Sequence, residues 1–304
     1  MNTQKTFTVG DKFTISQFLK RFPNDDTCLE EIKTLRWPNG LIPCNKCNKD
    51  TSHYKVTGRT AYACQFCGTH IYPTAGTIFD KSTTPLRLWF YAIYLMAQTR
   101  AGISAKQLQR ELGVTYKTAW RMFKQIRALM ADKDGTPLDG IVEIDETFIG
   151  GKTTNRKNVY GHGSTNKEVV MGMVQRDGKA YLKHVPNTGK WTLLKQIKEN
   201  VSPRASVYTD EFGSYIQLPN YGYFHDWVTH SKSEYARGDV HTQNIENIWS
   251  HLKRGITGVY RNVSKKYLQA YVDEYAFRYN NRRAGGYMFD LILKQVPEVK
   301  MLRS

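Results

Sequence analysis

Two short cysteine pairs constrain the N-terminal third of the chain more than any other feature of the sequence. They are CNKC at 44–47 and CQFC at 64–67, with sixteen residues between them. Each pair can place two thiolates on one metal ion, and two pairs complete a tetrahedral shell of four sulfurs. The spacing is within the range of a zinc ribbon. Because a closed shell leaves no open position for catalysis, we predict one structural Zn²⁺, held by Cys44, Cys47, Cys64 and Cys67.

Other interpretations of the cysteines are weaker. Buried free cysteines or a redox pair are the alternatives, but redox CxxC motifs seldom occur as two matched pairs. His53 and His70 could each replace a sulfur ligand, although four thiolates already fill the shell. Cys28 lies outside the cluster and is expected to pack within a helix. Five cysteines, four of them clustered, are too few for a disulfide framework in 304 residues.

The charge of the chain indicates the class of its partner. Its 304 residues include 44 Lys and Arg against 27 Asp and Glu, a net charge of +17 spread along the whole length. Such an excess is typical of proteins that bind a polyanion, most often nucleic acid. No apolar stretch approaches the roughly 18 residues that a membrane span needs, and no secretory signal is evident. We therefore expect a cytoplasmic, nucleoid-associated protein with no membrane partner, or a nuclear one in a eukaryote.

The segment SAKQLQRELGVTYKTAWRMFKQIRAL at 104–129 predicts two helices joined by a tight turn. Ser104 can cap the first helix, Gly113 can end it, and Thr115 can cap the second. A short Gly-containing turn between two such helices is typical of a helix-turn-helix, whose second helix enters the major groove of DNA. The alternative is an ordinary helical hairpin with a solvated basic face. The residues that the second helix would present to DNA are Tyr116, Lys117, Arg121 and Lys124.

The periodicity of the apolar residues changes near residue 140. Residues 85–131 have helical spacing, whereas IVEIDETFIGG, EVVMGMVQRDG, KAYLKHVPN and ASVYTD are strand-like. Between these regions, 131–140 has the composition of a linker. We predict a multidomain α+β/α/β protein with three parts: a helical segment and zinc ribbon at 1–82, a helix-turn-helix domain at 83–135, and a catalytic domain with C-terminal helices at 136–304.

Three acidic residues in the last part are candidate metal ligands. Asp145 lies within one apolar strand-like run, Asp210 ends a second, and Glu246 lies on a later helix. Lys253 follows Glu246 by seven residues, about two helical turns, so both share one face. Carboxylates suit Mg²⁺ or Mn²⁺. Two such ions roughly 3.5–4 Å apart can activate an attacking oxygen and stabilise the leaving one in phosphoryl transfer.

Neighbouring residues leave alternatives open for each acid. Strand alternation favours Asp145 over Glu146, which would point to the opposite face with Val142 and Ile144. Glu143 and Glu211 are acids of the same type, and a solvated strand end is the simplest interpretation of Asp210 and Glu211. Asn244 and Asn247 are the alternatives to Glu246.

The order of these parts resembles the zinc-ribbon DDE transposases of bacterial insertion sequences, the Merlin-related, ISXO2-like group. The resemblance covers nearly the whole chain through LRWPNGLIPCNKC, ISAKQLQRELGVTYKTAWRMFKQIR, IDETFIGGK, YTDEFGSY and HTQNIENIWSHLKRGITGVYRNVSKKYLQAYVDEYAFRYNNR. It implies a ribonuclease H-like catalytic fold from about 140 to 285. Asp145, Asp210 and Glu246 match the three acids of the family's pattern, and Lys253 matches the basic residue that follows the third.

The resemblance also implies an activity and its partners. We expect an enzyme, a polynucleotidyl transferase that binds terminal inverted repeats in double-stranded DNA, cleaves a strand to free a 3′-hydroxyl and joins it to target DNA. Joining two ends implies at least a dimer on DNA. The alternatives are a non-catalytic DNA-binding regulator and a nuclease or resolvase that cleaves without joining. The loop 150–168, either a DNA contact or a solvated loop, adds three candidate DNA-binding residues: Lys152, Arg156 and Lys157.

Overall fold

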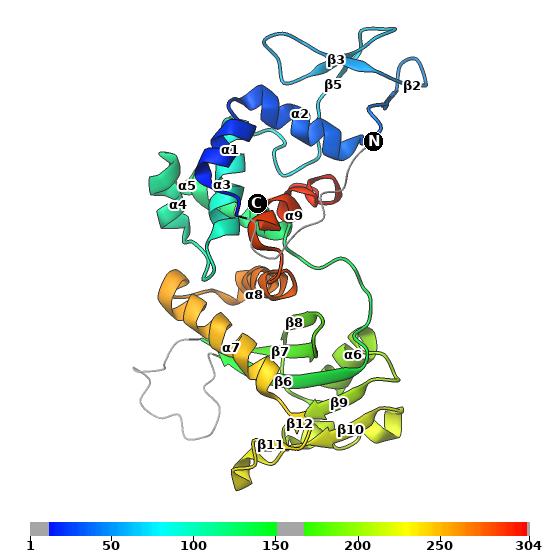
Figure 1. The fold of residues 1–304 in the computed structure, drawn as a ribbon, viewed down its shortest axis with the longest axis vertical. Coiled ribbons are helices and arrows are strands. Elements are labelled where there is room, and N and C mark those ends of the chain that lie inside the picture. Colours follow the sequence, from blue (N-terminus) through cyan, green and yellow to red (C-terminus); the bar gives the residue numbers. More distant parts are fainter. Residues whose placement is uncertain (1–11, 151–166, 303–304) are drawn as a thin grey trace. The chain divides into compact units, whose positions relative to one another are not determined.

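The computed structural model describes residues 12–150 and 167–302, which divide into two compact units. Unit 1 runs to Met130 and resumes at Arg283, and unit 2 spans Ala131–Arg282 (Figure 1). The sequence grouped residues 283–304 with the catalytic domain, whereas this division places them in unit 1. The further separation of the ribbon from the helix-turn-helix at residue 82 stays a prediction. Lys152, Arg156 and Lys157 lie outside the described residues.

The first two helices of unit 1 begin at residues whose side chains accept hydrogen bonds from their free N–H groups. Thr14 and Gln17 form a reciprocal capping box at the first helix, and Asn24, directly after Pro23, caps the second. The helices are α1 (Ile15–Arg21), α2 (Asp25–Arg36), α3 (Leu86–Gln98), α4 (Ala105–Leu112), α5 (Tyr116–Ala128) and α9 (Met288–Leu293), with short 3₁₀ turns at Gly285–Tyr287 and Val296–Glu298.

An aromatic core explains why the C-terminal segment belongs to unit 1. The Phe289 ring of α9 lies 5.7 Å from the Phe22 ring and 6.3 Å from the Phe90 ring, and all three are buried. Arg21 reaches across to Asp290 at 2.7 Å. Burial of three large rings favours this packing, since each removes extensive apolar surface from water. Among the described residues, no helix is both long and apolar enough to cross a membrane.

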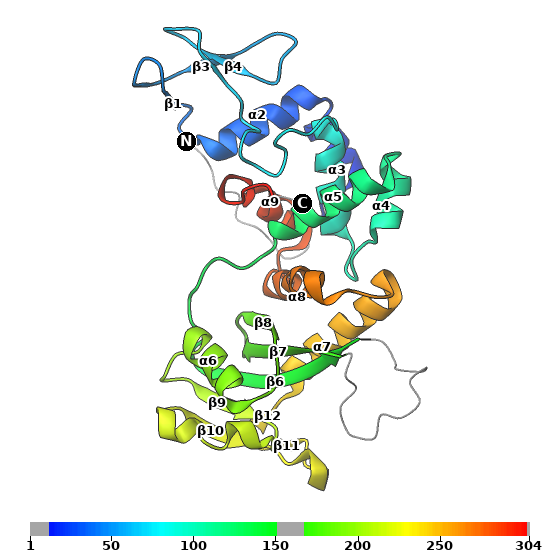
Figure 2. The ribbon, with the colours of Figure 1, turned by 180° about the vertical axis from the view of Figure 1, so that it is seen from behind.

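Along the chain, the ribbon follows α2 and precedes α3, and it consists of very short strands. They form a two-stranded sheet, β1 with β2, and a three-stranded sheet in the order β3-β4-β5. Figure 2 labels β1, β3 and β4, and Figure 1 labels β2 and β5. Their bounds are β1 (Ile42–Cys44), β2 (Lys49–Thr51), β3 (His53–Lys55), β4 (Tyr62–Cys64) and β5 (His70–Ile71). Strands of two or three residues bury little apolar surface, so the ribbon depends on another source of stability.

Unit 2 is built on a five-stranded mixed sheet in the order β10-β9-β6-β7-β8. The first three strands along the chain pair antiparallel, and the later two are parallel to the first. The strands are β6 (Ile141–Ile149), β7 (Glu168–Gln175), β8 (Ala180–Val185), β9 (Ser206–Thr209) and β10 (Phe224–Trp227), with a small hairpin of β11 (Ala236–Arg237) and β12 (Val240–His241).

Helices cover both faces of this sheet. The apolar residues of α6 (Lys190–Asn200) pack on one face with Val142 and Ile144. The apolar residues of α7 (Gln243–Gly255) and α8 (Lys265–Asn280) pack on the other face with Val170 and Val174 (Figure 1). A π-helical turn at Ile256–Tyr260 follows α7, and 3₁₀ turns lie at Gly213–Tyr215, Leu218–Tyr221 and His230–Lys232.

The outer edge of β8 is covered by α8 rather than left open. The backbone N–H groups of Ala180 and His184 donate to the side chains of Asn280 (2.7 Å) and Gln269 (2.8 Å). Polar side chains thus satisfy backbone groups that an unpaired edge strand would otherwise expose to other chains. The covered edge fixes α8, and with it α7, against the sheet.

Candidate functional site

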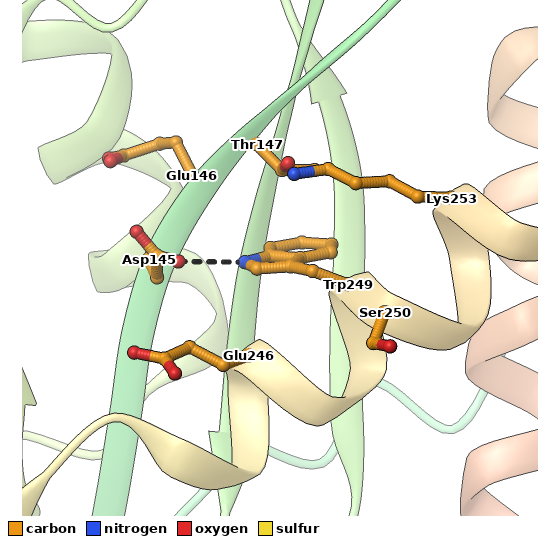
Figure 3. A pocket seen from close by; sticks show the side chains of 7 residues that line it. All are labelled: Asp145, Glu146, Thr147, Glu246, Trp249, Ser250 and Lys253. Carbon is orange, nitrogen blue, oxygen red and sulfur yellow. Dashed lines mark hydrogen bonds between the residues drawn. The ribbon is translucent and has the colours of Figure 1, made fainter.

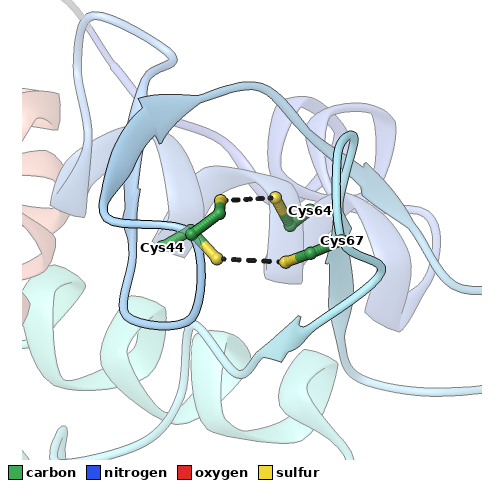
Figure 4. A group of neighbouring side chains, drawn as sticks. Cys44, Cys64 and Cys67 are labelled. Atoms are coloured by element: carbon green, nitrogen blue, oxygen red, sulfur yellow. Dashed lines mark hydrogen bonds between the residues drawn. The ribbon is translucent and has the colours of Figure 1, made fainter.

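The four cysteines of the two pairs converge as predicted. Their sulfur atoms all lie within 4.8 Å of one another, with Cys44 and Cys67 3.4 Å apart and Cys47 and Cys64 3.7 Å apart (Figure 4). Cys44 ends β1 and Cys64 ends β4, so each pair turns out of a strand. Cys28 is buried in α2, outside this cluster.

The two pairs close with the same backbone turn. The residue after each pair, Asn48 or Gly68, has a left-handed conformation, with φ of 51° and 66°. Its N–H donates at 2.9 Å to the carbonyl oxygen of the first cysteine of that pair. Gly adopts this conformation without strain, and Asn is among the side chains that tolerate it best. Two copies of one turn therefore point two pairs of sulfurs at a common centre.

Four thiols this close together compete for negative charge. Backbone N–H groups of Cys47 and Lys46 lower the pKa of the Cys44 thiol, and the Thr69 hydroxyl lowers the pKa of Cys67 to about 6. The hydrogen bond with Cys44 raises the pKa of Cys47 to about 12, because the sulfurs cannot all hold negative charge so close together. A bound cation would remove this conflict, so the cysteines fit Zn²⁺.

The predicted DNA-binding helix pair has the expected local structure. The Ser104 hydroxyl accepts from Gln107 N–H, Thr115 accepts from Thr118 N–H, and Gly113 ends α4 with φ of 65°. Tyr116 and Lys117 are exposed at the start of α5, and Lys124 is half-buried. Arg121 differs from the expectation that it faces outward, because its guanidinium donates to the carbonyl oxygen of Asp80 at 3.0 Å. Its role in DNA binding stays a prediction, as do those of the other three.

An acidic pocket lies between β6 and α7 in unit 2. It encloses about 340 Å³ and is lined by Asp145, Glu146, Thr147, Glu246, Trp249, Ser250 and Lys253 (Figure 3). β6 contributes the first three residues and α7 the others, so Glu246 and Lys253 share one helix face as the spacing predicted. Three of the four residues predicted for catalysis thus line one pocket.

Asp210, the fourth, lies next to this pocket through the pairing of two strands. β6 and β9 are parallel, with Ile141 opposite Ser206 and Glu143 opposite Tyr208. Continuing this register by two residues brings Asp210, directly after β9, beside Asp145. The pKa of Asp145 is consistent with this closeness, because after burial the charge of Asp210 also raises it. Parallel pairing therefore explains how acids far apart in the sequence become neighbours.

The acids of this region are held in an environment that disfavours negative charge. Burial first, and then repulsion from Asp210 and Glu246, raise the pKa of Asp145 to about 6. Burial also raises the pKa of Asp210. The same cause raises the pKa of Glu146 to about 8, although it accepts a hydrogen bond from Tyr215. A bound cation would stabilise the charged form of these carboxylates, and oxygen ligands fit Mg²⁺ or Mn²⁺.

Two residues that the sequence left as alternatives have structural partners. Glu211 accepts from the backbone N–H of Ser231 at 3.0 Å and is exposed. Glu143 is fully buried and accepts from Arg176 Nε, Asn244 N and Asn244 Nδ2, each at 2.8 Å. Since these donors occupy its oxygens at the first turn of α7, Glu143 holds the helix end rather than facing the pocket.

Three further residues near the pocket were missed by sequence reasoning. The indole N–H of Trp249 donates to Asp145 Oδ2 at 2.8 Å (Figure 3). The Tyr215 hydroxyl donates to Glu146, and His230 Nε2 lies 3.8 Å from Glu246 Oε1. Of these three, only Trp249 could have been predicted from the sequence, because it follows Glu246 by three residues and so lies on the same helix face. The contacts of the other two depend on turns that the sequence does not specify.

The acids are less tightly assembled than the cysteines. Within the described ranges, the four cysteines are the only group of at least three His, Cys, Asp or Glu residues whose ligand atoms all lie within 4.8 Å. Asp145 lies mid-strand, Asp210 follows a strand and Glu246 begins a helix, so they meet from three directions.

Comparisons with known proteins agree with the two candidate centres. A family model described as the ISXO2-like transposase domain matches residues 137–280, and one described as the transposase zinc-ribbon domain matches residues 23–70. The predicted zinc-ribbon domain is thereby confirmed, and these ranges include the predicted residues of both sites.

Relatives and solved structures were also found. A Halobacterium salinarum protein, described as an uncharacterized protein in transposable element ISH50, is 29% identical over 86% of this chain and 92% of its own length. An uncharacterized transposase-like protein of Haemophilus influenzae is 35% identical over 34% of this chain and 82% of its own.

Two crystal structures of Mos1 transposase assemblies have a much weaker likeness. The pre-cleavage transpososome has a TM-score of 0.27 and 13% identity, over 66% of this chain and 75% of that chain. The strand transfer complex has a TM-score of 0.30 and 12% identity, over 71% and 79%. At such scores the likeness identifies neither fold nor activity. The family matches and the Haemophilus relative carry the assignment: this chain belongs to the family of zinc-ribbon, ISXO2-like transposases.

Proposed function

We propose that this protein is a DNA transposase that cleaves DNA at the ends of its element, frees a 3′-hydroxyl and joins it to target DNA. The observation that carries the proposal is the acidic pocket of unit 2. There Asp145 and Glu246 line one cavity with Lys253, and Asp210 lies beside Asp145 by strand register. Family membership supports the same reaction class.

The chain's own residues divide the work of phosphoryl transfer between them. Asp145, Asp210 and Glu246 would hold two Mg²⁺ or Mn²⁺ ions. When bound, these ions supply charge neutralisation and activation of the attacking oxygen. Lys253, exposed on the pocket rim, would contact the phosphate backbone and hold the strand to be cut over the carboxylates. Asp145 and Asp210 are half-buried and Glu246 is exposed, and without bound cations their negative charge would repel a polyanion.

The sheet topology supports a ribonuclease H-like core for unit 2. Three antiparallel strands in chain order are followed by two strands parallel to the first, and helices cover both faces. This arrangement places Asp145 on the central strand and Asp210 after its parallel neighbour. A central position gives the carboxylates a rigid base, which metal-dependent chemistry requires.

DNA binding is proposed for unit 1, and the net charge of +17 of the chain supports it. The capped helices α4 and α5 would form a helix-turn-helix that reads the terminal repeats with Tyr116 and Lys117 at the start of α5. The cysteine cluster would hold one structural Zn²⁺ and give the ribbon the stability that its short strands lack. Joining two ends requires at least two copies of the chain on DNA.

The test uses the zinc-loaded full chain and DNA carrying the inverted repeats that flank its gene. With Mg²⁺, the wild type should nick the repeat end and join it to a target plasmid, and Asp145→Asn should abolish both products. Glu199→Gln, an equivalent change on the exposed face of α6, should retain both. Binding without nicking would favour the regulator, and nicking without joining would favour the nuclease. Equal products from Asp145→Asn and the wild type would reject the proposed site.

A further inference from the structure

The residue opposite Asp145 in the sheet is a glycine with no room for a side chain. Asp145 of β6 pairs with Gly172 of β7. A Cβ atom on Gly172 would lie 2.5 Å from Ile245 Cδ1 and 2.6 Å from Trp249 Cη2. Real Cβ atoms essentially never make contacts this short, so a side chain at position 172 would force Ile245 and Trp249 of α7 to shift. Gly172 therefore sets how closely α7 approaches β6 at the pocket.

Two polar contacts fix α7 along the same strand. Glu143 accepts from the backbone N–H of Asn244 at 2.8 Å and holds the first turn of the helix. Two residues further along the same strand face, Asp145 accepts from the indole N–H of Trp249 at 2.8 Å. The indole is nearly fully buried, at 4% exposure, and lies over Gly172. Helix and strand are thus joined at two points.

A buried indole N–H needs an acceptor, and a carbonyl oxygen would satisfy it. Here the acceptor is instead the carboxylate of a pocket acid. A hydrogen bond to one oxygen fixes the rotation of the whole carboxylate group, because both oxygens turn about the same bond. In proteins that bind metals, outer residues that hydrogen bond to a ligand in this way orient it and tune its affinity.

We propose that Trp249 is a positioning residue of the acidic pocket: its indole N–H holds Oδ2 of Asp145, so that Oδ1 is presented to the cation, and Gly172 provides the space for this contact. The inference rests on the proposed function, because it assigns Asp145 to the metal. It adds a residue pair, Trp249 and Gly172, whose effect on the reaction is exerted through Asp145.

The test measures Mn²⁺ binding by the zinc-loaded full chain, using electron paramagnetic resonance of the free ion, alongside thermal unfolding. Trp249→Phe keeps a ring but removes the N–H group, and we expect Mn²⁺ affinity to fall by about 10–100-fold. Ile248→Val, a buried change in the same apolar cluster, is the matched control. It should lower thermal stability comparably and leave Mn²⁺ affinity unchanged. Gly172→Ala should weaken Mn²⁺ binding with Trp249 intact.

A tryptophan analogue with sulfur in place of the ring N–H, installed at position 249, covers the case in which Trp249→Phe misfolds. It nearly preserves the shape of the indole, so weaker Mn²⁺ binding would support the hydrogen bond as the cause. Wild-type affinity with this analogue would overturn the inference and leave the proposed function intact. If the wild type itself binds no Mn²⁺ beyond what Asp145→Asn binds, the proposed function fails, and the inference fails with it.

Discussion

The cysteine cluster and the acidic pocket are both candidate metal centres, but they are assembled in opposite ways. Four sulfurs from two copies of one local turn already lie within 4.8 Å of one another. The acids come from the middle of β6, the end of β9 and the start of α7, and they form no equally tight group in the described part of the chain. One centre depends on local sequence, and the other depends on tertiary packing.

This difference separates the roles that the two centres can have. A closed set of soft thiolates fits a structural ion that stabilises a ribbon of very short strands. Carboxylates that are held apart on a strand, after a strand and on a helix leave room for cations, water and a phosphate between them. The two centres would not have separate roles if removal of one metal also removed the other, or if neither centre needed a metal.

The largest effect is expected from Cys44→Ser, which removes one ligand of the cysteine cluster. Structural zinc sites contribute on the order of 10–16 kcal/mol of apparent binding free energy, so the ribbon should unfold locally. Metal analysis should show well under one zinc per chain, and limited proteolysis should cut within the ribbon.

The matched control is Cys28→Ala in α2, a buried cysteine outside the cluster. It should lower thermal stability through lost packing and retain one zinc per chain. One zinc per chain in Cys44→Ser would contradict the four-sulfur site. Loss of Mn²⁺ binding by unit 2 in Cys44→Ser would contradict the independence of the two centres.

A smaller effect is expected from Glu143→Gln, which weakens the hydrogen bonds that hold the first turn of α7 against β6. The Glu143 carboxylate is fully buried and bonded to Arg176, and breaking a buried pair typically costs about 3–5 kcal/mol. Denaturant unfolding should report the loss, and zinc content should stay at one per chain. Glu199→Gln should stay within about 0.5 kcal/mol of the wild type. Unchanged stability of Glu143→Gln would mean that the helix is held by apolar packing alone.

The sequence predicted the locally encoded features well. Both cysteine pairs, the caps at Ser104 and Thr115, and the strand containing Asp145 follow from short-range spacing. Asp145 and Glu146 have different partners, Trp249 and Tyr215, but both line the pocket, so the preference for Asp145 stays a prediction. The family resemblance, now confirmed, implies the same three acids that strand-like runs and helix position had favoured, and their role stays a prediction.

Tertiary contacts explain what the sequence did not predict. Glu143 and Asp145 are both carboxylates on the same face of β6. Only the position of α7 makes Glu143 a partner of the helix end and Asp145 a residue of the pocket. Arg121 has the position of a DNA-facing side chain, yet Asp80, distant in the sequence, supplies an acceptor that holds it. The docking of α9 against Phe22 and Phe90 likewise depends on long-range packing.

The smallest effects are expected in the helix pair α4–α5, where Lys117 is exposed as predicted and Arg121 is not free to face outward. Lys117→Ala should weaken DNA binding across sequences and reduce the slope of log affinity against log salt by about 1. Arg121→Ala should lower the melting temperature and leave that slope unchanged, because its guanidinium is bound to the Asp80 carbonyl oxygen. Fluorescence anisotropy at several salt concentrations checks both. The reverse pattern would restore Arg121 as a DNA contact.

The central claim is that Asp145, Asp210 and Glu246 form one cation-binding centre. Crystals of the zinc-loaded chain soaked in Mn²⁺ test it directly, because anomalous scattering locates manganese and distinguishes it from zinc. We predict two manganese peaks roughly 3.5–4 Å apart, contacting the carboxylates of these three residues, with zinc alone at the cysteines. Absence of manganese at the three carboxylates, or manganese bound only at other acids, would contradict the account.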